Sequence, residues 1–488
     1  MNKHFLLLFL MAFFSCSYEK FDVVPGTSYP EDVSNILVKK CATAGCHTPQ
    51  SRASSGGLDF STWDNMFAGG RNGSSIIPFS TDYSYMLYSV NTDPNRGPVL
   101  SPTMPYNQSP LSDAEYQTLR NWISNGAPDA DGFVKYSDNP DRKKVYICMQ
   151  GCDQVAVIDA SSKNIMRYIP VGGDPNLIEA PHLIRVSPDG QYWYVVFYSG
   201  TYIQKFRASD DSLVASLDIG IGNWNTVMIT PDGSTGFVNG TGTNTVKVVD
   251  LNAMTTIITL TFDFPHGGFI ESTGRYYYLS SQNGNFIHKI DLNSAPFYDD
   301  VNYIVLEPGQ PRSTSSSFDP HELIATPDGS KYFVSCQKTN EVRVFQTSND
   351  SLLAIIPVGE KPQELDVSTS FPYVLVSCTE EPGTAGRKGI VNVINYNTLT
   401  VVASIYTGYQ PHGIAIDDDE GIAYVANLNY DSNGPAPHHI TECGGRNGYL
   451  TIIDLNTLQL YNRVFPDGYS SEYKNELLNY PYFVSLRK

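Results

Sequence analysis

The chain has few charged side chains, and basic ones are the scarcer kind. Only 17% of its 488 residues are charged, with 32 lysines and arginines against 50 aspartates and glutamates, which gives a formal net charge of −18. A chain this acidic is repelled by nucleic acids and by anionic membrane surfaces, so we expect neither as a partner. Long apolar runs are almost absent as well. The run at residues 5–14 is too short to cross a bilayer, and no later segment is apolar enough to do so.

That single apolar run belongs to a pattern typical of export. A short polar head at residues 2–4 precedes it, and Ser15 and Cys16 follow it. A cysteine directly after a small residue resembles a bacterial lipoprotein signal. The resemblance implies a signal peptide over residues 1–16 and a lipid on Cys16 as the only membrane attachment. The protein would then lie in the cell envelope, in the periplasm or at the outer membrane. The alternative is secretion without a lipid.

Cysteine is also scarce, with eight residues, but two of them lie in a heptapeptide that indicates a cofactor. Residues 41–47 read Cys-Ala-Thr-Ala-Gly-Cys-His. Covalent haem attachment requires two thiols, which add to the haem vinyl groups, and an adjacent imidazole that binds the iron. The usual motif has two residues between the cysteines, whereas this one has four. The alternative is a small disulfide loop from Cys41 to Cys46, with His47 at the surface.

The flanking sequence predicts two helices around a methionine. Apolar spacing after Pro30 favours an amphipathic helix that ends at Cys41, and a capping box at residues 112–115 begins a second helix that stops at Gly126. Met104 lies in the loop before this second helix, and its soft thioether suits the distal face of a haem. Met66 and Met86 are the rival distal ligands, although a core position is the better interpretation for Met86.

Residues 30–135 resemble the small single-haem cytochrome c domains that are often fused to other modules. The resemblance rests on the C-x4-C-H variant, which some multihaem cytochromes c contain, and on Leu-Ser-Asp-Ala-Glu at residues 111–115 with Leu-Arg-Asn-Trp-Ile at residues 119–123. It implies an all-α domain after a linker at residues 17–29. It also implies one covalent haem c, with His47 as the proximal and Met104 as the distal ligand of the iron.

From about residue 140 the chain repeats. A Pro-His or related pair, an inner strand and a Pro-Asp-Gly turn recur at intervals of roughly 40 residues, each followed by further short strands. Four short strands per repeat of this length are typical of a β-propeller blade. Residues 144–171 supply only the last three strands of a blade, and residues 480–485 read as the missing first strand. The sequence therefore predicts an all-β propeller of seven blades over residues 140–488, closed by its C-terminal strand.

The repeats resemble the YVTN-type propellers of exported bacterial proteins, with Tyr-Val-Ala-Asn at residues 424–427. Such a fold does not specify an activity. One position, at the start of each inner strand, concentrates polar side chains that we expect to ring one mouth of the central channel. Its occupants are His182, Asn225, His266, His321, Gln363 and His412, with Tyr482 on the closing strand. The four histidines could bind copper, zinc or iron. The alternative is that they bond to the backbone of a neighbouring blade.

The remaining cysteines suggest disulfides in an oxidising compartment. Cys148 and Cys152 flank a turn and are the favoured pair, while Cys336 and Cys378 are either free thiols or a bridge. Cys443 lies in a long insertion near residues 428–447, which also contains a His-His pair at residues 438–439 as a weaker metal-site candidate.

These observations indicate an exported haem c electron-transfer protein whose propeller binds a redox partner protein or a small-molecule substrate. Two alternatives remain. The propeller could be a redox enzyme domain with a metal or second cofactor at the histidine-lined mouth, or the whole chain could be a non-redox interaction scaffold. The sequence supplies no set of catalytic residues, and it leaves the substrate, the direction of electron flow and the oligomeric state open.

Overall fold

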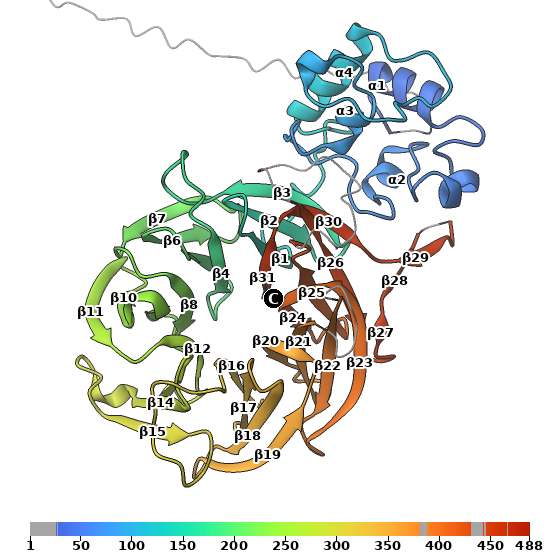
Figure 1. The fold of residues 1–488 in the computed structure, drawn as a ribbon. Helices are drawn as coiled ribbons and strands as arrows, with labels where there is room; N and C mark the ends of the chain where they lie inside the picture. The colour runs from blue at the N-terminus through green and yellow to red at the C-terminus, as the bar shows by residue number, and fades with distance from the viewer. Residues whose placement is uncertain (1–25, 27, 381–387, 431–442, 444–445, 466) are drawn as a thin grey trace, which may run out of the picture.

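The computed structural model describes residues 26, 28–380, 388–430, 443, 446–465 and 467–488. These residues form a ring of β-sheets with a smaller helical region against its outer side (Figure 1). No helix among them is long and apolar enough to span a membrane. The expected export signal, Cys16 and the histidine pair at residues 438–439 lie outside the described residues.

The helical region begins where the sequence predicts. Its elements are α1 (Glu31–Ile36), a π-helical turn (Leu37–Cys41), a 3-10 turn (Pro49–Ser54), α2 (Trp63–Phe67), α3 (Tyr85–Ser89), a second 3-10 turn (Pro94–Arg96) and α4 (Asp113–Ser124). The predicted capping box of α4 is confirmed. Ser112 Oγ accepts from Glu115 N at 3.3 Å, and Ser112 N donates to Glu115 Oε2 at 2.8 Å. Tyr116, Leu119 and Trp122 form part of its buried face.

Seven sheets form the blades of the ring. The innermost strand of a blade is the first in its sequence, except in blade 1, where it is the C-terminal strand of the chain. Blade 1 contains β1 (Lys144–Met149), β2 (Gln154–Asp159), β3 (Asn164–Pro170) and β31 (Pro481–Arg487). Blade 2 contains β4 (Pro181–Val186), β5 (Tyr192–Phe197), β6 (Tyr202–Arg207) and β7 (Leu213–Asp218). Blade 3 contains β8 (Trp224–Ile229), β9 (Thr235–Gly240), β10 (Thr245–Asp250) and β11 (Thr255–Thr261). Blade 4 contains β12 (Pro265–Ile270), β13 (Tyr276–Ser281), β14 (Phe286–Asp291) and β15 (Val301–Val305).

The other three blades follow the same order. Blade 5 contains β16 (Pro320–Ala325), β17 (Lys331–Cys336), β18 (Glu341–Gln346) and β19 (Ser351–Pro357). Blade 6 contains β20 (Glu360–Val367), β21 (Tyr373–Glu380), β22 (Lys388–Asn395) and β23 (Thr400–Tyr409). Blade 7 contains β24 (Pro411–Asp417), β25 (Ile422–Asn427), β26 (Asn447–Asp454) and β27 (Gln459–Leu460), with β30 (Asn475–Asn479) beside β26. A hairpin of β28 (Asn462–Val464) and β29 (Ser470–Glu472) extends from it.

The C-terminal strand closes the ring, as the sequence predicts. Strand β31 pairs antiparallel with β1 in the register Lys144↔Arg487 and Ile147↔Val484. The inner strands β31, β4, β8, β12, β16, β20 and β24 each contact the next around the ring. Pairing β31 with β1 covers the inner edge of β1, which would otherwise be free. The prediction of a seven-bladed propeller is confirmed.

The recurring Pro-Asp-Gly segments turn the chain between inner and second strands. In blade 2, Asp189 accepts hydrogen bonds from Ser187 Oγ at 2.6 Å and from Gln191 N at 3.0 Å. Gly190 follows with φ of 69°, a left-handed conformation that costs glycine little. The carboxylate of Asp232 in blade 3 and that of Asp328 in blade 5 accept the corresponding bonds. The same side-chain chemistry thus sets the same hairpin in blades 2, 3 and 5.

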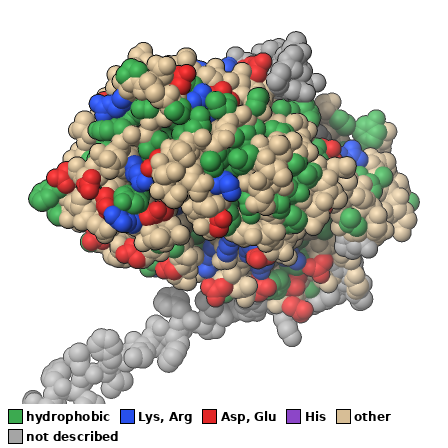
Figure 2. All heavy atoms as spheres, turned by 90° about the horizontal axis from the view of Figure 1, so that it is seen from below, with side chains coloured by type: hydrophobic (Ala, Val, Ile, Leu, Met, Phe, Trp, Pro, Cys, Tyr) green, Lys and Arg blue, Asp and Glu red, His purple; other side chains and the backbone are tan. Residues whose placement is uncertain are grey.

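The helical region is held against blades 1 and 7 by polar contacts. Arg52 is fully buried and forms ion pairs with Asp59 at 3.1 Å and with Asp467 at 2.7 Å. Asn164, at the start of β3, donates to Phe67 O at 2.8 Å, and Arg463 Nη2 donates to Asn164 Oδ1 at 2.9 Å. On the face seen in Figure 2, acidic and basic side chains are intermixed, in keeping with the dispersed charge of the sequence.

The prediction of a disulfide between Cys148 and Cys152 is wrong. Cys152 is bonded to Cys443, with Cα atoms 5.3 Å apart, and Cys148 is a free, buried thiol. Cys148 lies within β1 and packs into the core shared by blades 1 to 3, whereas Cys152 lies in the turn that follows. Ring closure brings Cys443 to that turn across a separation of 291 residues. Cys336 and Cys378 are both free.

Peptide mapping of the unreduced protein is expected to recover Cys152 linked to Cys443. Cys148, Cys336 and Cys378 should react with a thiol reagent only after unfolding, because burial shields them and raises the pKa of each thiol above its usual value. A peptide linking Cys148 to Cys152 would contradict this pairing.

Candidate functional site

The Cys-x4-Cys-His segment follows directly from α1. The π-helical turn that continues α1 ends at Cys41, whose side chain is buried, while Cys46 is half-buried. Neither thiol is in a disulfide, so the alternative of a Cys41–Cys46 bridge is not realised. His47 N donates to Cys41 O at 3.1 Å, which folds the histidine back beside the first cysteine. One short loop therefore holds two free thiols and an imidazole together.

The imidazole of His47 is largely enclosed. Its ring centroid lies 4.9 Å from that of Phe60, and Nδ1 is buried without a hydrogen-bond partner. Burial lowers the pKa of His47 below its usual value, so the ring is neutral and can act as a ligand. Burial also raises the pKa of Cys41 to about 12. A buried thiol and a largely enclosed imidazole therefore lie side by side in this loop.

The three candidate thioethers all belong to the core beside this loop. Met66 and Met86 are buried in the same apolar cluster as Cys41, and Met104 packs against it while remaining partly exposed. The backbone of Met104 is fixed by a hydrogen bond from its N to Ser89 O at 2.8 Å. Met86 lies in α3 and has the core position that the sequence favoured. Met104 alone of the three lies at the edge of the cluster.

The polar ring of the propeller has one backbone geometry in every blade. The residue two positions before each ring residue has φ between 48° and 58°, a left-handed conformation that turns the chain inward. These residues are Ala180, Asn223, Phe264, Asp319, Lys361, Gln410 and Tyr480. A shift of register follows at the start of each inner strand. Such β-bulges redirect side chains, and here they give the predicted ring of converging side chains.

Hydroxyl groups from the preceding blade hold the ring backbone in place. Ser280 Oγ donates to His321 O at 3.2 Å, Ser335 Oγ donates to Gln363 O at 2.8 Å, and Ser377 Oγ donates to His412 O at 2.5 Å. Each bond joins the second strand of one blade to the inner strand of the next. The ring is therefore rigidly positioned, because its carbonyl groups are bonded across the blade interfaces.

The ring surrounds one mouth of the channel. A cavity of about 680 Å³, called here the mouth cavity, is lined by ring residues that include His182, Asn225, His266, His321 and Tyr482. The aromatic rings are in contact around it: the centroids of His266 and His321 are 4.1 Å apart, and those of His182 and Tyr482 are 4.5 Å apart. His412 stacks behind Tyr482 at 3.7 Å.

The four ring histidines differ in their hydrogen bonds: His182 and His266 have a partner, whereas His321 and His412 lack one on any side chain. His182 Nδ1 lies 2.8 Å from Gln150 Nε2, and His266 Nδ1 lies 3.1 Å from His321 O on the next blade. His266 thus makes the interblade backbone bond that the sequence offered as an alternative. The imidazole nitrogens of His321 and His412 are buried and lack a side-chain hydrogen-bond partner. Burial lowers the pKa of His412 to about 3 and that of His321 well below its usual value, so both rings are neutral.

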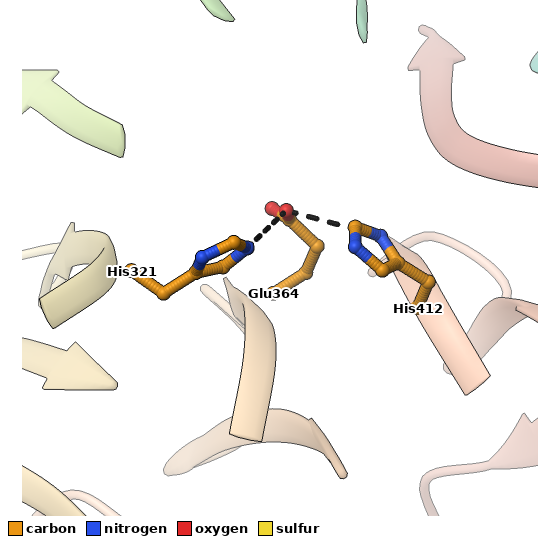
Figure 3. Close-up of side chains that lie close together, drawn as sticks. All are labelled: His321, Glu364 and His412. Carbon is orange, nitrogen blue, oxygen red and sulfur yellow. Dashed lines mark ion pairs between the residues drawn. The ribbon is translucent and has the colours of Figure 1, made fainter. Parts of the chain in front are cut away.

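A buried carboxylate lies between these two unsatisfied imidazoles. Glu364 Oε1 is 3.9 Å from His321 Nε2 and 3.9 Å from His412 Nδ1 (Figure 3). We call His321, Glu364 and His412 the triad; its candidate ligand atoms lie within 4.8 Å of one another. Burial, with the nearby Glu322, raises the pKa of Glu364 well above its usual value. The set of two nitrogen ligands and one oxygen is one that divalent transition metals accept.

Sequence reasoning found the two histidines but missed Glu364. It searched one repeat-equivalent position, whereas the bulge directs two successive residues of β20 toward the channel, Gln363 and Glu364. A signal was available, because an acid directly follows the ring residue in blades 5 and 6, at Glu322 and Glu364. Carboxylates in otherwise apolar inner strands are rare without a partner.

Comparisons with known proteins assign the chain to no family. No family model and no curated protein matches the chain. A solved structure of Kuenenia stuttgartiensis hydrazine synthase is 20% identical, over 59% of this chain and 79% of that chain, with a TM-score of 0.45. The dihydro-heme d1 dehydrogenase NirN, in complex with DHE, is 13% identical over 78% and 89%, with a TM-score of 0.47. A functionally unknown protein from Desulfotomaculum acetoxidans DSM 771 is 14% identical over 69% and 99%, with a TM-score of 0.49.

Proposed function

We propose that this chain is an exported haem c electron-transfer protein whose propeller docks a redox partner or a small-molecule substrate. The observation that carries the proposal is the pair of free thiols at Cys41 and Cys46 beside the largely enclosed imidazole of His47, whose Nδ1 lacks a hydrogen-bond partner. In this assignment Cys41 and Cys46 attach the haem, and His47 and Met104 hold its iron. When bound, the haem supplies one-electron exchange between ferric and ferrous iron.

The residues around the motif orient its groups and exclude water. The hydrogen bond from His47 N to Cys41 O keeps the imidazole next to the first thiol, and Phe60 packs against the imidazole ring. Lys40 Nζ pairs with Glu115 Oε1 at 2.5 Å, which joins the motif to the capping box of α4. The apolar cluster beneath Cys41, which includes Trp63 and Leu119, provides the low-dielectric surroundings that tune a haem potential.

One further observation supports export. The Cys152–Cys443 disulfide requires an oxidising compartment, and haem is attached to c-type apocytochromes outside the bacterial cytoplasm. Lipid attachment at Cys16 is part of the proposal, and mass spectrometry of the mature N-terminus tests it.

A reduced-minus-oxidised visible spectrum tests the haem assignment. Protein matured in a cytochrome-c-competent periplasm is expected to show the α-band of a c-type haem in the reduced state. The oxidised protein should show the weak long-wavelength charge-transfer band that methionine ligation gives ferric haem. This band should disappear in Met104→Leu, because leucine offers no sulfur lone pair, and the α-band should remain.

Met86→Leu is the matched control, because it removes a thioether from the same core at a nearly constant volume. It should leave both bands in place. Loss of the charge-transfer band in Met86→Leu but not in Met104→Leu would reassign the distal ligand. A colourless protein would contradict the haem proposal and favour the non-redox scaffold.

A further inference from the structure

The propeller contains a second, independent arrangement of ligand groups. The triad comes from the inner strands of three consecutive blades: His321 from β16, Glu364 from β20 and His412 from β24 (Figure 3). All three side chains are more than nine-tenths buried. Among the described residues, only the two imidazoles lie within ion-pair distance of Glu364. The guanidinium of Arg185 acts on Glu364 from beyond this distance, so the carboxyl group directly faces two neutral rings.

The interatomic distances exclude a hydrogen-bonded cluster and bring three ligand atoms close to metal-binding range. At 3.9 Å, the two separations between Glu364 Oε1 and the imidazole nitrogens are too long for hydrogen bonds. Ligand atoms bound tetrahedrally to one ion at about 2.0–2.2 Å lie about 3.3–3.6 Å apart. The triad atoms lie within 4.8 Å of one another, so the side chains would move toward the ion when it binds.

Burial of these groups without a partner is otherwise expensive. Among the described residues, the imidazole nitrogens of His321 and His412 lack a side-chain hydrogen-bond partner, which costs desolvation free energy, and burial disfavours the charged form of Glu364. Glu322 adds a second carboxylate nearby: its Oε1 accepts from Gly268 N and Leu323 N, but its Oε2 is buried and unpartnered. A divalent cation would satisfy the triad and offset the repulsion between Glu364 and Glu322.

We propose that His321, Glu364 and His412 bind one divalent transition-metal ion beside the mouth cavity of the propeller. Two imidazoles and a carboxylate suit borderline ions such as Zn²⁺, whereas Ca²⁺ and Mg²⁺ take mainly oxygen ligands. His321 also lines the mouth cavity, so the ion is reachable from that side, and three protein ligands leave a position open for a small molecule. This inference does not rest on the proposed haem, because all of its residues lie in the propeller.

The experiment is zinc binding to the full chain, matured in the periplasm, without a polyhistidine tag and stripped with a chelator. Equilibrium dialysis against Zn²⁺ with metal analysis should give one tightly bound ion per chain that Ca²⁺ does not displace. Glu364→Gln should weaken this binding by at least about 100-fold, more than the loss of an outer-shell group causes. The haem spectrum should not change in this variant.

The control is His288→Asn, which replaces a buried histidine of β14 that is not in the ring. It should bind Zn²⁺ like the unaltered protein. A Cys41→Ser, Cys46→Ser variant should lack haem and keep the triad ion, so the two proposals fail separately. If Glu364→Gln does not fold, thermal unfolding of the unaltered protein tests the proposed metal site instead. Zn²⁺ but not Ca²⁺ should raise its Tm. Absence of stoichiometric zinc, or equal binding by Glu364→Gln, would overturn the proposal.

Discussion

Replacing Cys41 and Cys46 together by serine is expected to abolish the covalent haem attachment that we propose. A serine hydroxyl does not form the thioether bonds through which a c-type haem is attached, so the cofactor would at most remain bound through His47 and Met104. Haem staining of the denatured protein after electrophoresis should fall from one haem per chain to background. The apolar core next to Cys41 should remain folded, since a thiol and a hydroxyl differ little in size.

The matched control is the Cys336→Ser, Cys378→Ser variant. These two cysteines are also free and buried, but they lie in the propeller, at the end of β17 and within β21. Haem staining should be unchanged in this variant. Stain that survives in the Cys41, Cys46 variant, or that disappears equally in both, would contradict the assignment of the heptapeptide as the attachment site.

The propeller was predictable because the residues that specify each blade lie close together in the sequence and recur from blade to blade. Each blade contains its own turn, for example Pro188-Asp189-Gly190, and its own inner strand, so periodicity alone gives the number of blades. The closing strand was also predictable, because the start of the repeats supplies only three strands of blade 1 and the C-terminal segment supplies one strand more than blade 7 needs. The capping box of α4 is local in the same sense, since Ser112 and Glu115 are three residues apart.

Contacts between distant segments were not predictable. Cys152 bonds to a residue 291 positions away, and Arg52 pairs with Asp467 across 415 positions. A preference for short sequence separation favoured Cys148 as the partner of Cys152, yet the strand geometry of β1 buries Cys148 in the core. Glu364 was missed for a different reason. Its place beside the channel results from a β-bulge in β20, which turns two successive side chains the same way. The regular alternation of side chains along a strand does not predict such a position.

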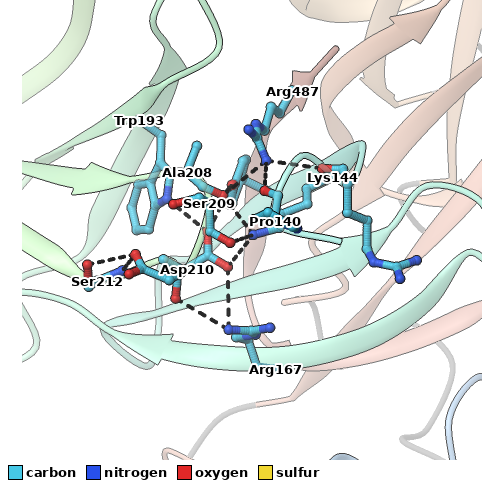
Figure 4. A network of polar contacts seen from close by, with 12 residues as sticks. Pro140, Lys144, Arg167, Trp193, Ala208, Ser209, Asp210, Ser212 and Arg487 are labelled. Carbon is cyan, nitrogen blue, oxygen red and sulfur yellow. Dashed lines mark hydrogen bonds and ion pairs between the residues drawn. The ribbon is translucent and has the colours of Figure 1, made fainter. Parts of the chain in front are cut away.

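A buried polar network joins the two ends of the ring. Lys144 in β1 and Asp211, in the turn between β6 and β7, form an ion pair at 2.9 Å with side chains 1% and 0% exposed. Tyr146 donates to Asp211 Oδ1 at 2.9 Å, and Lys144 Nζ also donates to Ala208 O at 2.7 Å. Arg487 of the closing strand donates to the same carbonyl at 3.2 Å. The network, part of which Figure 4 shows, ties blade 1 and its closing strand to blade 2.

Asp211→Asn is expected to lower the free energy of unfolding by about 3–5 kcal/mol, because it leaves the ammonium group of Lys144 buried without its counter-charge. Asparagine keeps the shape of the side chain and tolerates the left-handed φ of 61° at this position, so the loss reports the charge rather than backbone strain. Asp210→Asn is the control next to it in the chain: its pair with Arg207 is about half exposed, so it should cost less than about 1 kcal/mol. Urea unfolding followed by circular dichroism measures both values. Adding Lys144→Met to Asp211→Asn should recover part of the loss, since the buried ammonium group that lost its counter-charge is then removed. Equal effects of Asp210→Asn and Asp211→Asn would show that the network does not stabilise the closure of the ring.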